Sequence, residues 1–236
     1  MADGNKKKVT AVLFDMDGLL LDTENAYTVA QQRVLDRFGR TFTWELKAKM
    51  MGRQPLDAVN VLIRELQLRP EEITAEQFLA ERDALLEVAF AESELMPGAE
   101  RLVTHLAACG VPMAVATGSD AARFALKTSR HAALFGRFSH VVTGDMVPRA
   151  KPDPAIFLQA VAGFRGKQAV SDLGSVLVFE DAPNGVEAAL AAGMQVVMVP
   201  YPGLPLDLQH SGATQVLKSL EDFRPEEWGL PPFPDN

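Results

Sequence analysis

Five short, valine-rich apolar runs recur along the chain, and each would be apolar on both faces of a strand. Because alternate side chains of a strand point to opposite faces, this pattern is typical of a parallel sheet that is covered on both sides. The predicted strands are Val9–Asp15, Val111–Thr117, His140–Gly144, Ser175–Asp181 and Met194–Pro200.

Amphipathic helical patterns separate these runs. Residues 97–110 carry an apolar helical stripe and end at Gly110, a residue type favoured just after a helix C-terminus. Residues 152–164 and 183–193 each open with a proline, which suits the first turn of a helix. The alternation predicts an α/β fold, a Rossmann-like doubly wound parallel sheet with helices on both faces.

One long stretch breaks the alternation, because residues 23–95 contain helical patterns and no candidate strand. An all-helical block between the first and second strands indicates an inserted small domain. We therefore expect an α/β core formed by residues 1–22 and 96–236, with a helical domain at residues 23–95. The helical patterns of the insert cover residues 23–39, 55–68 and 74–90.

The overall composition is acidic, with a formal net charge of -8 and a pI near 5.1. This argues against nucleic acid as a partner, because binding it depends on neutralising phosphates. The one cysteine, Cys109, excludes an internal disulfide, fits a reducing compartment and is interpreted as a small core residue. No segment reaches the roughly 18 apolar residues of a membrane span, so we expect a soluble cytoplasmic protein.

Ionisable and hydroxyl side chains gather where the predicted strands end. Ligands of open parallel α/β sheets bind beyond the carboxyl ends of the strands, so we expect these side chains to meet at one edge. They are Asp15 at the end of the first strand and Asp17 just after it, Thr117 at the end of the second strand with Ser119 and Asp120 after it, Glu180 and Asp181 at the end of the fourth, and Lys151 in "KPDP".

Several carboxylates at one edge repel one another unless a cation lies among them. Oxygen ligands that leave room for water suit Mg²⁺. A lysine (Lys151) with hydroxyl and backbone N–H donors beside the metal makes a site for a phosphate oxyanion. Glycines at Gly18 and Gly118 would let the backbone approach that anion closely. The sequence therefore predicts a combined magnesium and phosphate site.

Phosphoryl transfer through a carboxylate is the chemistry that such a site serves. An aspartate nucleophile, Asp15, divides phosphomonoester hydrolysis into two displacements through an aspartyl phosphate. Asp17 would protonate the leaving alkoxide and then take a proton from water. That role needs a raised pKa, which neighbouring carboxylates and a dry site can supply.

The segments "FDMDG", "VATGS", "KPDP" and "FEDAPNG" resemble, in this order, the four motifs of the haloacid dehalogenase superfamily of phosphotransferases. The resemblance spans nearly the whole chain, and the helical insert is similar to the superfamily's C1-type mobile cap. It implies that Asp15 is the nucleophile and Asp17 the acid/base, and that Thr117 and Lys151 bind phosphate.

The resemblance also implies a ligand set for Mg²⁺. It consists of Asp15, the backbone carbonyl of Asp17, and Asp181. Glu180 is a further ligand in one reading and a supporting group behind the ligands in the other.

Further segments, among them "KAKMMGR" and "PEEWGLPPF", are similar to a subgroup that contains pseudouridine-5′-phosphatases and the glycerol-3-phosphate phosphatases of plants and algae. In related caps the glycine-containing loop faces the catalytic cleft, which makes Gly52 and Arg53 candidates for substrate selection. The alternative reading of these two residues is a plain turn between helices.

Several residues have a structural interpretation beside a functional one. Ser119 and Asp120 are interpreted as caps of the helix that follows them. We expect His131 to have a structural role, and Trp44 and Trp228 to be packing residues.

The leading functional hypothesis is a Mg²⁺-dependent phosphatase for a small phosphorylated metabolite, such as pseudouridine 5′-phosphate or glycerol 3-phosphate. A β-phosphoglucomutase-like sugar phosphomutase is the alternative. It is disfavoured because Tyr27 stands where those relatives carry a histidine. A catalytically silent binding protein is the third hypothesis, and a monomer is the expected state.

Overall fold

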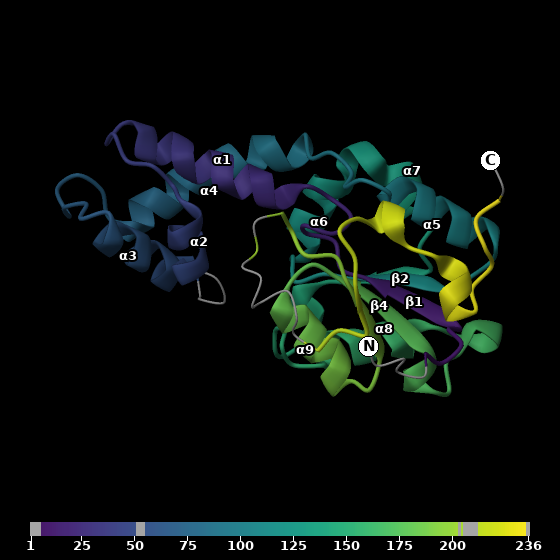
Figure 1. The fold of residues 1–236 in the computed structure, drawn as a ribbon. Coiled ribbons are helices and arrows are strands. Elements are labelled where there is room, and N and C mark those ends of the chain that lie inside the picture. Colours follow the sequence, from purple (N-terminus) through teal and green to yellow (C-terminus); the bar gives the residue numbers. More distant parts are fainter. Residues whose placement is uncertain (1–5, 51–54, 203, 205–211, 235–236) are drawn as a thin grey trace. The chain divides into compact units, whose positions relative to one another are not determined.

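The computed structural model describes residues 6–50, 55–202, 204 and 212–234. The chain divides into two compact units, one formed by Met1–Asp22 and Glu94–Asn236 and the other by Thr23–Ser93. We call them the core unit and the helical unit, and both are drawn in Figure 1. Gly52 and Arg53, the candidates for substrate selection, lie outside the described residues.

A parallel sheet with strand order β3-β2-β1-β4-β5-β6 forms the centre of the core unit. This is the order of the Rossmann-type doubly wound fold, so the predicted fold class is confirmed. The strands are β1 (Ala11–Phe14), β2 (Met113–Ala116), β3 (His140–Val142), β4 (Val176–Glu180), β5 (Gln195–Met198) and β6 (Gln215–Val216).

Alternate residues of the central strands supply two separate apolar cores. Val12 and Phe14 of β1 belong to one buried cluster, while Ala11 and Leu13 belong to the other. Helices α5 and α7 pack into the first cluster and α8 and α9 into the second, on opposite faces of the sheet (Figure 1). The helices of this unit are α5 (Ala99–Ala108), α6 (Ala121–Thr128), α7 (Ala132–Phe135), α8 (Ala155–Gly163) and α9 (Pro183–Ala191).

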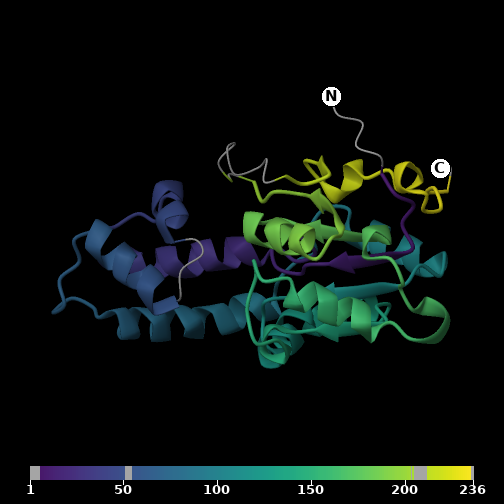
Figure 2. The same cartoon turned by 90° about the horizontal axis from the view of Figure 1, so that it is seen from below.

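The C-terminal segment packs over the first cluster, largely without regular structure. Phe223 and Trp228 are both 1% exposed, with ring centroids 6.4 Å apart. Trp228 also accepts a backbone hydrogen bond from Val9 at 2.9 Å, beside the first strand. Trp228 is therefore a packing residue, as predicted, and Figure 2 shows this segment in yellow along the core unit.

The helical unit has its own apolar core, to which all four of its helices contribute residues such as Leu35, Leu62 and Phe78. A capping box starts its longest helix, because the Thr74 hydroxyl accepts from the backbone of Gln77 and the Gln77 side chain accepts from the backbone of Thr74. The helices are α1 (Thr23–Asp36), α2 (Trp44–Met50), α3 (Pro55–Glu65) and α4 (Ala75–Ala91). In the described part of the chain, no helix is both long and apolar enough to cross a membrane.

Three local features differ from the sequence expectations. Strand β6 has two residues, which is too short for a periodic pattern to show in the sequence. It is recognised as a strand only because it pairs with β5. Helix α2 is short and mostly polar, with Leu46 and Met50 as its buried apolar residues. The interpretation of Cys109 as a core residue was wrong, because this cysteine is exposed at the C-cap of α5, beyond the last buried turn.

Candidate active site

The carboxyl ends of β1, β2 and β4 meet at the centre of the sheet, where the topology changes direction. From β1 the chain builds β2 and β3 on one side, and β4 to β6 lie on the other. Asp15 follows β1 directly, while Glu180 is the last residue of the adjacent strand β4. At such a point the connections that leave adjacent strands run to opposite sides of the sheet, and open α/β sheets bind ligands in the crevice between them.

Three carboxylates lie together at this edge of the sheet. One oxygen from each of Asp15, Glu180 and Asp181 falls within 4.8 Å of the others, and Asp15 and Glu180 are buried. The absence of a side chain at Gly185 makes room for this arrangement, because an added Cβ would overlap the Glu180 carboxyl group. This set of oxygen donors fits a hard divalent cation.

Lys151 enters the same cluster from the segment before α8. Its Nζ lies 2.5 Å from Asp15 Oδ1 and 2.6 Å from Glu180 Oε1, and it donates to the Ala116 carbonyl at 3.1 Å. Burial alone would lower the pKa of Lys151, but Asp15 and Glu180 outweigh this effect and raise that pKa above its ordinary value. Lys151 is therefore a fixed positive charge beside Asp15.

The electrostatic balance at Asp15 differs from that of an ordinary aspartate. Burial raises the pKa of the Asp15 carboxyl from 3.8 to about 7. Lys151 opposes this rise, while the charges of Glu180 and Asp17 add to it. Because burial and the neighbouring acids disfavour the ionised form of Asp15, a cation bound beside it would stabilise that form.

Asp17 belongs to a second group of polar contacts, on the side of β2 and α6. Gly18 turns the chain here with a φ of 77°, and its N–H donates to the Leu21 carbonyl at 2.9 Å. Asp17 Oδ2 accepts from the hydroxyls of Ser119 at 2.9 Å and Thr117 at 3.2 Å. Thr117, the predicted phosphate ligand, thus contacts Asp17.

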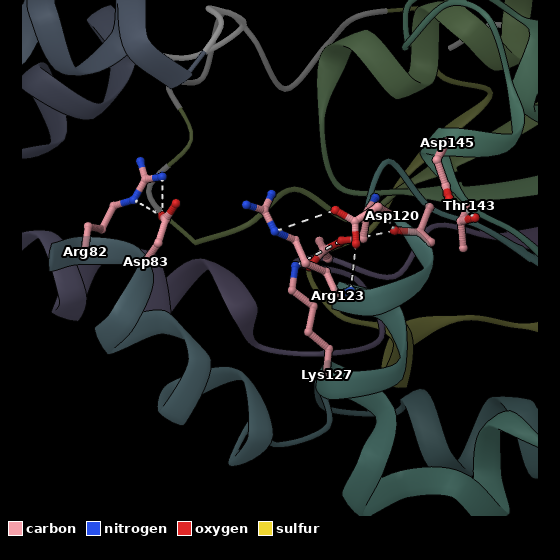
Figure 3. A network of polar contacts seen from close by, with 10 residues as sticks. Arg82, Asp83, Asp120, Arg123, Lys127, Thr143 and Asp145 are labelled. Carbon is pink, nitrogen blue, oxygen red and sulfur yellow. Dashed lines mark hydrogen bonds and ion pairs between the residues drawn. The ribbon is translucent and has the colours of Figure 1, made fainter. Parts of the chain in front are cut away.

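Lys127 completes this second group and was missed by sequence reasoning. Its Nζ lies 2.6 Å from Asp17 Oδ1 and donates to Ser119 Oγ at 3.1 Å, while its side chain is 2% exposed. Figure 3 shows Lys127 reaching from α6 into this network. Its position three residues after Phe124 places it on the inward side of the helix, which is the signal that could have revealed it.

The two residues interpreted as helix caps have different roles. Asp120 is the N-cap of α6 and accepts from the Arg123 backbone at 2.8 Å, as expected. Ser119 instead directs its hydroxyl to Asp17, so its interpretation as a cap was wrong.

The backbone at Gly118 is held by the neighbouring loop yet is open on one side. An added Cβ at Gly144 would overlap the Gly118 carbonyl, so the loop after β3 packs directly against it. An added Cβ at Gly118 itself would meet nothing within 4 Å. This space beside the backbone suits the approach of a ligand.

The structure thus brings the predicted residues together in two adjoining groups. Asp15, Lys151, Glu180 and Asp181 form the first, and Asp17 with Thr117 the second. Tyr27, the residue on which the sequence disfavoured the mutase hypothesis, packs edge-on against Phe90 within the helical unit.

Comparison with known proteins agrees with this geometry. The family model of haloacid dehalogenase-like hydrolases matches residues 9–193. The chain is 50% identical over 231 residues to (DL)-glycerol-3-phosphatase 2 of Arabidopsis thaliana, covering 97% of this chain and 94% of that protein. It is 46% identical over 238 residues to a Drosophila melanogaster protein named "Probable pseudouridine-5'-phosphatase", covering 100% of both.

A solved structure supports the same assignment. The chain superimposes with a TM-score of 0.78 on a haloacid dehalogenase family hydrolase from Deinococcus radiodurans that was crystallised with bound phosphate and sodium. The two are 28% identical, and the match covers 95% of this chain and 98% of the other. The predicted family is therefore confirmed: the chain belongs to the haloacid dehalogenase-like hydrolases and is a phosphatase.

Proposed function

We propose that the protein is a Mg²⁺-dependent phosphomonoesterase that hydrolyses a small phosphorylated metabolite through a phosphorylated Asp15. The observation that carries the proposal is the position of Asp15. It lies buried at the switch point of the sheet, 2.5 Å from Lys151 and beside two further acids. A nucleophile, a cation and candidate metal ligands are thereby available at one edge of the sheet.

The chain's own groups have distinct tasks in this proposal. Lys151 holds Asp15 Oδ1 in place and offers positive charge where a phosphate would bind. An Asp15 oxygen attacks phosphorus, and Asp17 supplies the proton that the leaving alkoxide requires. In the second step Asp17 accepts a proton from water as the Asp15–phosphate bond breaks.

Mg²⁺ would be held by Asp15, Asp181 and the backbone carbonyl of Asp17, with Glu180 as a direct ligand or as a group behind the ligands. When bound, it would neutralise charge on the acids and on the phosphate. The close approach of Glu180 to Asp15 and Asp181 supports a direct role. The contact of Glu180 with Lys151 supports the other reading.

The substrate class that we propose is glycerol 3-phosphate or pseudouridine 5′-phosphate. The names of the relatives that are 46% and 50% identical support these two compounds. We further propose that the helical unit is a cap that excludes water and large substrates, with Gly52 and Arg53 contributing to selection. The expectation of a monomer stays a prediction.

The test is the steady-state kcat/KM of purified protein in Mg²⁺ across a panel of phosphomonoesters. The panel contains glycerol 3-phosphate, pseudouridine 5′-phosphate, uridine 5′-phosphate, glucose 1-phosphate and 2-phosphoglycolate. Asp15→Asn should abolish turnover of every substrate, because the amide cannot form the phosphorylated intermediate. Asp172→Asn is the matched control, since Asp172 is an exposed residue of the core unit paired with Lys7. Turnover retained by Asp15→Asn would refute the proposal.

A further inference from the structure

A buried lysine outside the four recognised motifs contacts the proposed acid/base. Lys127 lies on α6, 110 positions along the chain from Asp17, and its Nζ lies 2.6 Å from Asp17 Oδ1. With Thr128 it is one of the two buried residues of that helix. Its Nζ contacts Asp17 and Ser119, which both belong to the candidate site.

The two aspartates of the first motif have different lysines. Lys151 contacts Asp15 and Glu180, whereas Lys127 contacts Asp17 and Ser119. Because the cations come from separate elements, the carboxylates are oriented independently. Asp17 is held at both oxygens, by Lys127 at Oδ1 and by Ser119 and Thr117 at Oδ2.

Stability alone is a poor explanation for Lys127. Removing a lysine from water is costly, and a buried ion pair often contributes no more than an apolar replacement of similar size. The pair also leaves Asp17 less enclosed than Lys127, with side-chain exposures of 23% and 2%. The cation is thus buried while the carboxylate that it holds keeps an opening, an arrangement that suits orientation of a working group.

We propose that Lys127 is a positioning residue for Asp17. It directs the carboxyl group that protonates the leaving oxygen, and Ser119 assists it through a hydroxyl that contacts both side chains. In the step concerned, the bond from Asp15 to phosphorus forms, the bond from phosphorus to the alcohol oxygen breaks, and the Asp17 proton moves to that oxygen. The inference rests on the proposed function.

A comparison of leaving groups tests this role. Nitrophenolate departs from p-nitrophenyl phosphate without a proton, whereas the alkoxide of an alkyl phosphate requires one. Loss of a positioned acid should therefore slow hydrolysis of the alkyl phosphate more. For Lys127→Met, kcat/KM on the best alkyl phosphate of the panel should fall on the order of 100-fold, within the range for a general acid. On p-nitrophenyl phosphate it should fall only a few-fold. Lys127→Arg should recover part of the loss.

Two further variants keep the test decisive. Lys167→Met changes an exposed lysine in the same unit and should leave both substrates unaffected. If Lys127→Met does not fold, as judged by circular dichroism, Ser119→Ala removes only a hydroxyl and should change the substrate ratio in the same direction. Equal losses on both substrates, or no loss, would overturn the positioning role.

Parallel variants separate this inference from the proposed function. Activity retained by Asp15→Asn would remove the nucleophile on which both depend. If Asp17→Asn lowered kcat/KM equally on the alkyl phosphate and on p-nitrophenyl phosphate, the acid role of Asp17 itself would be refuted. If Asp15→Asn is inactive and Asp17→Asn shows the dependence, an unchanged ratio in Lys127→Met refutes the positioning role alone.

Discussion

At the scale of single residues, the active site places like charges close together at a cost to the folded state. Asp15 is 6% exposed and has two further carboxylates for neighbours, so its ionised form is poorly solvated. Lys151 compensates only in part, since the pKa of Asp15 remains raised to about 7. Functional sites commonly trade stability for reactivity in this way.

This raised pKa predicts a pH-dependent effect of Asp15→Asn in metal-free protein. The folded state holds a proton on Asp15 up to about pH 7, whereas the unfolded chain loses it near the ordinary value of 3.8. The folded state therefore binds more protons between these values, and the contribution of Asp15 to stability falls as the pH rises through them.

Asp15→Asn lacks this titration, so its Tm in EDTA should rise relative to the unmodified protein between about pH 4 and pH 7 and then level off. Thermal unfolding at matched ionic strength measures the difference. Asp172→Asn, at an exposed site, should show no such trend. A difference for Asp15→Asn that is independent of pH would contradict the assignment.

At the scale of secondary-structure elements, short segments acquire their functional positions from the loops around them. The Gly118 backbone is held by close packing of Gly144, and Asp120, two residues later, caps the start of α6. Together these contacts hold the segment that carries Thr117 and Ser119. In the helical unit a local hydrogen-bonded motif, the Thr74–Gln77 capping box, likewise holds the start of α4.

Thr74→Ala should destabilise the protein by about 1 kcal/mol, the usual cost of losing an N-cap. The variant leaves the Gln77 backbone N–H, now bonded to the Thr74 hydroxyl at 3.2 Å, without that acceptor. Urea denaturation followed by circular dichroism checks this value. Thr74→Ser keeps the hydroxyl and should stay near the original stability, while an unchanged midpoint for Thr74→Ala would show that the cap contributes nothing.

At the scale of the whole molecule, a sheet and an inserted helical unit are built on separate apolar cores. The candidate metal ligands follow two adjacent strands of the sheet, so a bound ion links β1 to β4. A ligand that binds only the folded state stabilises it in proportion to the logarithm of its concentration.

Mg²⁺ should therefore raise the Tm of the protein, by an amount that corresponds to roughly 2.7 kcal/mol at 100 times the dissociation constant. Asp181→Asn should weaken this response strongly, because it removes a charged ligand. Scanning calorimetry with increasing Mg²⁺ measures the shift, and Asp172→Asn should respond as the unmodified protein does. An equal shift in Asp181→Asn would place the metal elsewhere.

Much of this architecture was predictable because it depends on local patterns. Runs that are apolar on both faces identify five of the six strands, and the rule for the carboxyl ends of parallel strands locates Asp15, Glu180 and Asp181. Apolar helical stripes identify the helices that cover the sheet. The motif order then identifies the family, which the comparisons confirm.

The sequence by itself determined the sheet, its flanking helices and the edge where acids gather, since side-chain periodicity and chain direction set these features locally. Only the tertiary structure revealed that Lys127 contacts Asp17 across 110 positions, that Ser119 faces this pair and that Cys109 is exposed. Such contacts depend on which helix face meets which loop. The packing of segments that are distant in the sequence decides these contacts, so the local sequence around any one of these residues does not predict them.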